Sequence, residues 1–124
     1  MTSAEIIRLQ GVYLDDLRPE LEAALAALLG EGRPTRVLDA GCGRQTWLEL
    51  PASAHVVGLD TSAQEMAENP RIDEHLVGDV QTYPLPQQSF DAAICWWVLE
   101  HLPEPERAVA NLAQSLRSLS LIHI

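Results

Sequence analysis

The chain of 124 residues carries 18 acidic and 8 basic residues, a formal net charge of −10, and 47% of its residues are hydrophobic. This length supports a single domain that can bury a core without disulfides or structural metals. The negative charge and the lack of a basic stripe argue against nucleic acid as a partner, because phosphate backbones are bound by clustered lysine and arginine.

The two cysteines, Cys42 and Cys95, lie in apolar segments without CxxC spacing, so the sequence predicts neither a metal site nor a disulfide. No apolar run approaches the roughly 18 residues of a membrane span, and the first residues lack the pattern of a signal peptide. We therefore expect a cytoplasmic protein with no membrane span. All eight basic residues are arginine, which together with abundant Ala, Leu and Pro indicates GC-rich coding DNA and a bacterial source.

Residues 1–34 precede the first predicted strand and contain one predicted helix. Pro19 is followed by a helical stripe of leucines and then by Gly30 and Gly32. Proline favours the first turn of a helix, and glycine favours the residue that ends it. We expect this helix to pack on the sheet beside the first strand. Tyr13 either packs in the core or lines a pocket.

Residues 37–43 indicate a short, wholly buried strand that delivers the carboxylate of Asp39, followed by a loop with Gly41 and Gly43. The glycines allow the backbone to approach a ligand closely. In open α/β sheets, ligands bind outside the carboxyl ends of the strands, and the first strand-to-helix turn is the usual contact. After this loop we expect a short helix over residues 44–50, ended by the next proline.

Two more strands are predicted over residues 55–60 and 75–78. Asp60 ends the first of them, about 20 residues after the glycines, where a carboxylate can accept hydrogen bonds from two vicinal ribose hydroxyls. A helix begins after it, with Ser or Thr as the N-cap. The second strand ends in Gly78 and Asp79, which taken alone are a common turn signal.

A fourth strand is predicted over residues 90–96, after a loop that contains two prolines. Adjacent strand residues face opposite sides, so one of Trp96 and Trp97 packs in the core while the other is available to stack on a ligand. The chain then turns toward a helix that begins near Pro103 and extends to about residue 117. His101, in this turn, either acts as a general base or has a capping or hydrogen-bonded structural role.

These motifs, in this order, resemble those of the class I S-adenosylmethionine-dependent methyltransferases. Asp39, Gly41 and Gly43 match the first motif, apolar-apolar-Asp-x-Gly-x-Gly-x-Gly, and Gln45 stands at its third glycine. With Gln45 there, either the loop keeps a non-positive φ or the methionine tail of the cofactor sits differently. The run Leu-Pro-x-x-Ser-Phe-Asp, followed by Leu-Glu-His-Leu, is similar to the branch that methylates small molecules, which includes ubiquinone and menaquinone methyltransferases.

The resemblance implies methyl transfer from S-adenosylmethionine to a small-molecule acceptor in one displacement. Asp39 would bind the methionine ammonium, and Asp60 would hold the ribose. Asp79 and the backbone N–H that follows it would recognise the donor and acceptor edge of adenine. Met66 either packs near the adenine or fills the core. The implied cofactor-binding residues are Asp39, Ala40, Gly41, Cys42, Gly43, Asp60, Thr61, Met66, Gly78, Asp79, Val80, Cys95 and Trp96, with His101 as the candidate catalytic base.

The predicted fold is α/β, a Rossmann-like doubly wound parallel sheet with the four strands in the order 3-2-1-4. Family members continue through a Pro-Gly-Gly turn into strands 5–7, which we expect this chain to lack. The predicted parts are a helical lid over residues 1–34, an incomplete cofactor-binding core over residues 35–118, and a separate stretch over residues 119–124. The uncovered apolar edge of the fourth strand, residues 92–97, would then promote self-association.

Residues 119–124, Leu-Ser-Leu-Ile-His-Ile, are also the in-frame translation of ctgtctcttatacacatc, a transposon end used as a sequencing-library adapter. We hypothesise that these six residues are an adapter scar on an incompletely assembled reading frame, to be excluded from fold reasoning. Resequencing the source DNA across the codon for Ser118 tests the hypothesis, and we expect a frame that continues through a Pro-Gly-Gly turn. A genomic read with native codons for the six residues would refute it.

Two other functions are compatible with these motifs. A nicotinamide-dependent oxidoreductase shares the sheet, but the third glycine of its Gly-x-Gly-x-x-Gly pattern would fall on Thr46, and Asp39 would place negative charge near a pyrophosphate. A non-catalytic cofactor-binding or interaction module is the other alternative, because Gln45 departs from the first motif. The sequence names neither the methyl acceptor nor the oligomeric state.

Overall fold

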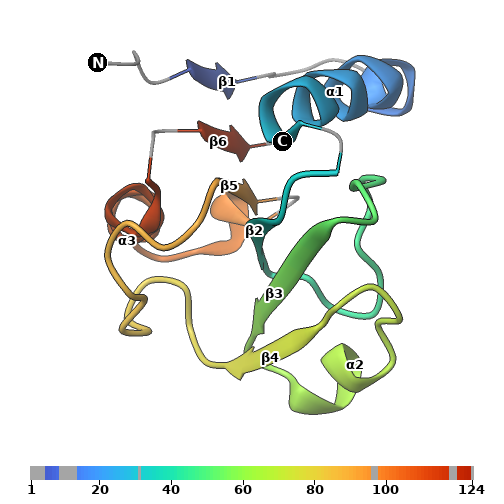
Figure 1. Ribbon diagram of the computed structural model, residues 1–124. Helices are drawn as coiled ribbons and strands as arrows, with labels where there is room; N and C mark the ends of the chain where they lie inside the picture. Colours follow the sequence, from blue (N-terminus) through green and yellow to red (C-terminus); the bar gives the residue numbers. More distant parts are fainter. Residues whose placement is uncertain (1–4, 9–13, 31, 96–97, 118–119, 124) are drawn as a thin grey trace.

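The computed structural model describes residues 5–8, 14–30, 32–95, 98–117 and 120–123. In these ranges the strands form one parallel sheet in the order β1-β6-β5-β2-β3-β4 (Figure 1). The strands are β1 (Glu5–Arg8), β2 (Thr35–Ala40), β3 (Ala54–Asp60), β4 (Glu74–Val77), β5 (Ala92–Cys95) and β6 (Ser120–His123). The predicted order 3-2-1-4 corresponds to β4-β3-β2-β5 and is confirmed.

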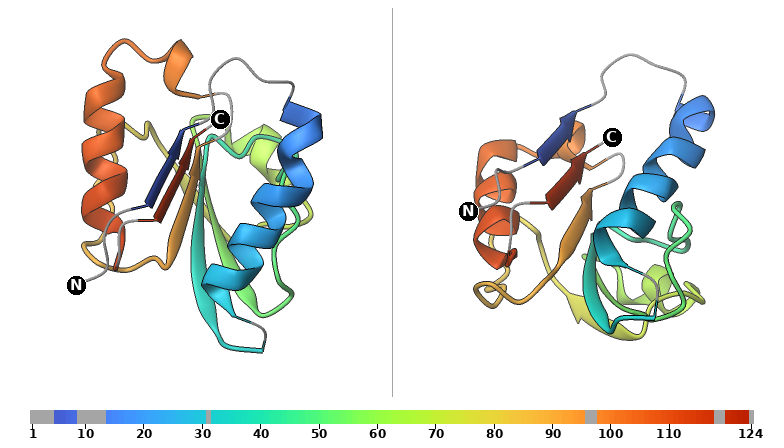
Figure 2. Two further views of the ribbon diagram at one scale, coloured as in Figure 1. Left: turned by 90° about the horizontal axis from the view of Figure 1, so that it is seen from above. Right: turned by 45° about the horizontal axis from the view of Figure 1, so that its top comes forward.

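Helices cover both faces of the sheet, as a doubly wound fold requires (Figure 2). Helices α1 (Leu14–Leu29) and α2 (Ala63–Ala67) contribute side chains to the core on one face, and α3 (Pro105–Ser115) contributes to the core on the other. Residues of β5 alternate between the two cores: Ala92 and Ile94 join the first, and Ala93 and Cys95 the second. Strands β2, β3 and β5 are mostly buried, and burial on both faces explains why their sequences are largely apolar.

Helix α1 packs on the sheet as predicted, through Leu21, Leu25 and Leu29. It begins at Leu14, however, so the prediction that Pro19 lies in the first turn is wrong. A packed apolar stripe can hold a helix together across one missing hydrogen bond, because tertiary contacts outweigh local propensity. The predicted end is confirmed: Gly30 has a φ of 72°, and its N–H donates to Ala26 O over 3.0 Å.

The expectation that the sheet ends at the fourth strand is wrong. Strand β6 pairs in parallel with β5, with Ala93 opposite Leu121 and Cys95 opposite His123. Strand β1, which the sequence did not predict, pairs with β6 in turn. The run of residues 119–124 contains two isoleucines and two leucines, residue types that suit a buried parallel strand.

The edge of β5 is therefore covered, and the free edges of the sheet belong to β1 and β4. The predicted self-association through an exposed β5 loses its physical basis. Strand formation does not bear on the DNA origin of residues 119–124, which stays a prediction for resequencing. In the described parts of the chain, no helix has the length and apolar character needed to cross a membrane.

Candidate functional site

Two adjoining cavities lie where the carboxyl ends of β2, β3 and β4 meet. We call the one beside the glycine loop, of about 360 Å³, the loop cavity. The other, of about 270 Å³, is the strand cavity. The loop cavity is lined by Gly41, Cys42, Gly43, Arg44, Gln45, Trp47, Glu65 and Val98. The strand cavity is lined by Gly41, Leu59, Asp60, Thr61, Gly78, Asp79, Val80, Gln81, Val98, Leu102 and Pro103.

Asp60 ties together the loops that follow β2 and β3. Its Oδ2 accepts a hydrogen bond from Gly43 N over 2.9 Å, and its Oδ1 accepts one from Ser62 N over 2.8 Å. Hydrogen bonds from backbone N–H groups to a carboxylate are among the stronger ones in proteins. Asp60 therefore fixes the glycine loop while its carboxylate borders the strand cavity.

The glycine loop adopts a conformation that favours glycine at both predicted positions. Gly41 has a φ of 73° and Gly43 a φ of 52°. A Cβ on Gly41 would collide with Cγ2 of Val98, so this side chain packs directly over the loop. Gln88 is the one non-glycine residue with positive φ in the described part of the chain, so Gln45 keeps a non-positive φ, the first of the two alternatives for that position.

Asp39 is only 3% exposed, at the end of β2. Burial raises the pKa of its carboxyl to about 7; a hydrogen bond with Thr46 lowers the pKa, and the nearby charge of Asp60 raises it. The neutral form of the Asp39 carboxyl therefore persists to a much higher pH than in an exposed aspartate. A cation placed beside it would favour the ionised carboxylate, so the site is suited to a positively charged ligand group.

The two cysteine thiols of the site are buried and unreactive. Burial raises the pKa of both Cys42 and Cys95 to about 12, and the charge of Asp39 adds to the effect at each. The thiolate is the nucleophilic form of cysteine, and at neutral pH neither residue supplies it. Their part in the site is structural: Cys42 Sγ fills the space that a side chain at position 58 would need, 2.8 Å from a Cβ built there.

Asp79 holds the loop after β4. Its Oδ1 accepts from Gln81 N over 2.8 Å, and both carboxylate oxygens accept from Gln81 Nε2 over 3.1 Å. These bonds, that from the backbone first, hold the pKa of Asp79 below its usual range. Gln81 Oε1 in turn accepts from Glu104 N over 2.8 Å, which links this loop to the start of α3. The sequence analysis missed Gln81, because its role depends on a partner 23 residues away.

The helix predicted over residues 44–50 is absent, because a distant side chain holds this segment. The buried amide of Asn69 donates to Gly43 O over 3.4 Å and to Thr46 Oγ1 over 3.2 Å. Farther along, Glu49 N donates to Glu22 on α1. These bonds replace the intrahelical ones, so no helix N-terminus follows the glycine loop. Asn69 is a second residue that sequence reasoning missed, since no local pattern identifies it.

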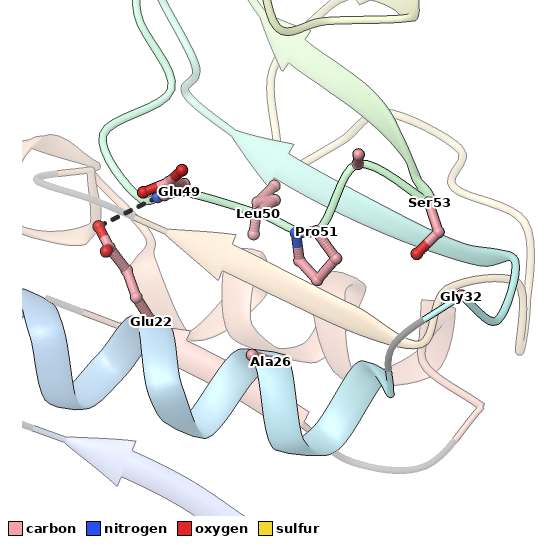
Figure 3. A pocket seen from close by; sticks show the side chains of 8 residues that line it. Glu22, Ala26, Gly32, Glu49, Leu50, Pro51 and Ser53 are labelled. Carbon is pink, nitrogen blue, oxygen red and sulfur yellow. Dashed lines mark hydrogen bonds between the residues drawn. The ribbon is translucent and has the colours of Figure 1, made fainter.

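A third cavity, larger than the loop and strand cavities, lies away from all the predicted site residues. It has about 610 Å³ and borders the amino ends of β2 and β3, between α1 and the loop before β3 (Figure 3). It is lined by Glu22, Ala26, Gly32, Glu49, Leu50, Pro51, Ala52 and Ser53. Figure 3 shows the Glu22 carboxylate directed at the backbone N–H of Glu49, 3.1 Å away. Because ligands of open α/β sheets bind at the carboxyl edge, we place the functional site at the two smaller cavities.

Comparisons with known proteins identify the family of the chain. Residues 38–124 match the methyltransferase domain family. The structure of an S-adenosylmethionine-dependent methyltransferase from Mesorhizobium loti is similar to 76% of this chain and 47% of its own, with a TM-score of 0.59 and 31% identity. The chain belongs to the class I S-adenosylmethionine-dependent methyltransferases.

Other relatives of this methyltransferase domain are named ubiquinone biosynthesis O-methyltransferase. The one from Aromatoleum aromaticum is 33% identical over 92 residues, 66% of this chain and 39% of that protein. The one from Coxiella burnetii is 32% identical over 90 residues, 65% of this chain and 38% of that protein. The chain thus spans well under half the length of these relatives. The structure titled [4+2]-cyclase SpnF, at 24% identity and a TM-score of 0.59, shares the fold alone.

The remaining predicted site residues of the methyltransferase domain differ in their exposure and in whether they line a cavity. Thr61 is exposed and lines the strand cavity, whereas Ala40 and Cys95 are fully buried. Met66 is also fully buried, in the core beneath α1 and α2, as the core-filling alternative requires. The side chain of His101 is 76% exposed, lines neither cavity, and places Nε2 3.7 Å from Glu100 Oε1.

Three of the candidate residues, Tyr13, Trp96 and Trp97, lie outside the described residues. The lid predicted over residues 1–34 stays a prediction. The described part of that segment approaches the loop cavity through Arg18, whose guanidinium lies 5.7 Å from the ring centroid of Trp47. In the residues that the structure describes, no group of three or more His, Cys, Asp or Glu side chains is placed to hold a metal ion.

Proposed function

We propose that the chain binds S-adenosylmethionine across the loop and strand cavities and serves methyl transfer to a small-molecule acceptor. The observation that carries this is the row of carboxylates at the ends of three neighbouring strands, where Asp60 and Asp79 line the strand cavity and Asp39 is buried just before Gly41, at which the two cavities meet. Such a row suits a ligand with one cationic end and several hydrogen-bond donors.

Each carboxylate has a distinct part in the proposed site. Asp39 holds the methionine ammonium, directly or through water, and its burial favours a cation over neutral or anionic groups. Asp60 accepts from the ribose hydroxyls, and Asp79 with the N–H of Val80 recognises adenine. The glycine loop brings its backbone close to the ribose and the methionine tail of the cofactor. Cys95, at the buried end of β5, and Trp96, which follows it in the sequence, are assigned to flank that tail.

The chemistry assigned to the protein is alignment and exclusion of water. S-adenosylmethionine supplies an electrophilic sulfonium methyl group when bound. The chain's task is to hold the cofactor so that the acceptor can approach in line with the carbon–sulfur bond, a gain that comes from positioning. No described residue of the two cavities is a histidine, and base catalysis by His101 stays a prediction that its exposed position does not support.

The geometry disfavours a dinucleotide at this site. A pyrophosphate is usually held by the N-terminus of the helix that follows the glycine loop, and residues 44–50 form no helix. Asp39 and Asp60 would also place negative charge near two phosphates. The names of the two relatives favour a quinone or phenol oxygen as the acceptor, while the net charge of −10 disfavours nucleic acid.

Thermal unfolding with added ligands tests the cofactor. S-adenosylhomocysteine at about 100 times its Kd should stabilise the protein by roughly 2.7 kcal/mol, which raises Tm by several degrees. NAD at the same concentration should leave Tm unchanged. Stabilisation by NAD alone would assign the site to the oxidoreductase alternative, and no effect of either ligand would overturn the proposal.

The fold is also compatible with a cofactor-binding module that does not transfer methyl groups, since the fold neighbour SpnF is titled a cyclase. Methyl transfer from radiolabelled cofactor distinguishes the two functions. It should be assayed with the full-length protein on a panel of quinones, phenols, amines and carboxylates. Cofactor binding without label transfer to any acceptor class would favour the non-catalytic module.

A further inference from the structure

Val98 lies at the junction of the two cavities. Gly41 and Val98 are the two residues that line both of them. Cγ2 of Val98 packs so closely over Gly41 that a Cβ on the glycine would overlap it. At this point, therefore, the apolar side chain of Val98 and the backbone of Gly41 together separate the two cavities.

Core packing and a backbone hydrogen bond hold Val98 in position. It packs against the core that α3 shares with the sheet, beside Leu99 and Leu102. Its carbonyl accepts a hydrogen bond from His101 N over 3.0 Å, which closes the short 3₁₀ helix η1 (Leu99–His101). Val98 is itself partly exposed, so displacing its side chain from Gly41 does not require the core to unfold.

We propose that Val98 is a gate between the nucleoside half and the amino-acid half of the cofactor site. This inference rests on the proposed function. In the structure described here the gate is closed, and an extended ligand can occupy both cavities only after Val98 leaves Gly41. A nucleoside without the amino-acid tail needs only the strand cavity and binds without opening the gate.

If Val98 is a gate, the free energy needed to move its side chain away from Gly41 lowers the apparent affinity for an extended ligand. When the competent conformation is a minor one, the apparent Kd is the intrinsic Kd divided by its population. Val98→Ala removes the two methyl groups that cover Gly41 and should keep the junction open. The variant should bind S-adenosylhomocysteine roughly tenfold more tightly if the open form is about one tenth populated in the unmodified protein. Affinity for adenosine should not rise, because adenosine does not cross the junction and can only lose its contact with Val98 in the strand cavity.

Calorimetric titration of both ligands into the unmodified protein, Val98→Ala and Val98→Leu tests the gate. Val98→Leu enlarges the side chain and should weaken S-adenosylhomocysteine binding more than adenosine binding, because only the former ligand needs the junction to open. Val109→Ala is the matched control, because Val109 packs against the same core but lines neither cavity. It should change neither affinity, whatever it does to the unfolding midpoint.

The outcomes separate the gate from the proposed function. If the unmodified protein binds neither ligand, the proposed function fails and the gate fails with it. If it binds both, but Val98→Ala changes the two affinities equally or not at all, the gate alone is overturned. Tighter binding of S-adenosylhomocysteine by Val98→Ala and weaker binding by Val98→Leu, without the same pair of changes for adenosine, support the gate.

Discussion

Asp39→Asn should reduce affinity for S-adenosylmethionine by at least about 30-fold, since removing one partner of a buried charge pair costs about 2–5 kcal/mol. The same substitution should stabilise the unliganded protein above pH 7. Asparagine keeps the shape of the side chain and its hydrogen-bonding capacity toward Thr46 but carries no charge, so burial no longer opposes it. This variant thus separates the contribution of the Asp39 carboxylate to cofactor affinity from its effect on the free energy of unfolding.

The sign of the stability effect follows from the raised pKa. Burial moves the pKa of Asp39 from 3.8 to about 7. Between these values the folded protein retains a proton that the unfolded chain has released, so the free energy of unfolding falls as pH rises. Above pH 7 the loss is complete and amounts to about 4 kcal/mol at most, at roughly 1.4 kcal/mol for each pKa unit. Affinity for the cationic cofactor should rise across the same window, with release of a proton on binding near pH 6.

Denaturant unfolding at pH 5 and pH 8, combined with titration of S-adenosylhomocysteine, measures both effects. Asp73→Asn is the matched control. The Asp73 carboxylate accepts from Val56 N over 2.8 Å near the opposite edge of the sheet, and this bond holds its pKa below the usual range. The control should be less stable than the unmodified protein at pH 8, the reverse of Asp39→Asn, and should bind normally. Unchanged affinity in Asp39→Asn would contradict the role given to this carboxylate.

Asp60→Asn should lower affinity for S-adenosylhomocysteine and for adenosine alike, by about 100-fold. The amide NH₂ cannot accept, so either Gly43 N–H or Ser62 N–H loses its partner, and a hydrogen bond to a charged group is worth about 1.5–3 kcal/mol. The ribose loses an acceptor at the same time. A lower affinity for adenosine distinguishes Asp60→Asn from Asp39→Asn. The latter should leave adenosine affinity unchanged, because adenosine has no ammonium group.

Asp91→Asn controls for the loss of a carboxylate that holds backbone. Asp91 Oδ2 accepts from Arg36 N over 2.8 Å at the amino edge of the sheet, away from both cavities. It should lower stability to an extent similar to Asp60→Asn yet leave both affinities within about twofold, since a lost hydrogen bond to a charged group costs about 1.5–3 kcal/mol and here affects folding only. Equal affinity losses in the two variants would show that the effect of Asp60→Asn comes from folding.

The features that could be predicted from the sequence are those with a local cause. Strands β2, β3 and β5 are mostly buried and leave apolar runs in the sequence, and Asp39 and Asp60 stand at the ends of two of them, so these strands and the edge with the acidic residues could be predicted. The order of the strands came from the resemblance to the methyltransferase family. Gly30 ends α1 and Ser62 caps α2 through contacts within four residues, where Ser62 Oγ accepts from Glu65 N. Such signals need no knowledge of the rest of the fold.

The features that were missed depend on contacts between distant residues. Residues 44–50 are irregular because the Asn69 amide, from beyond α2, bonds to their loop. Val98 is an ordinary apolar residue in the sequence, and its place over Gly41 emerges only when β5 lies beside β2. Strand β1 could not be predicted because its partner, β6, comes from the other end of the described chain.

The pairing of β1 with β6 also bears on how the chain acquires its structure during synthesis. The register places Glu5 opposite Ser120, so β1 leaves the ribosome long before the residues that pair with it are made. Pairings with such a large sequence separation form late, because loop closure must precede them. We therefore expect β2, β3, β4 and β5 to assemble co-translationally, while β1 remains without a sheet partner until translation of the described residues is complete.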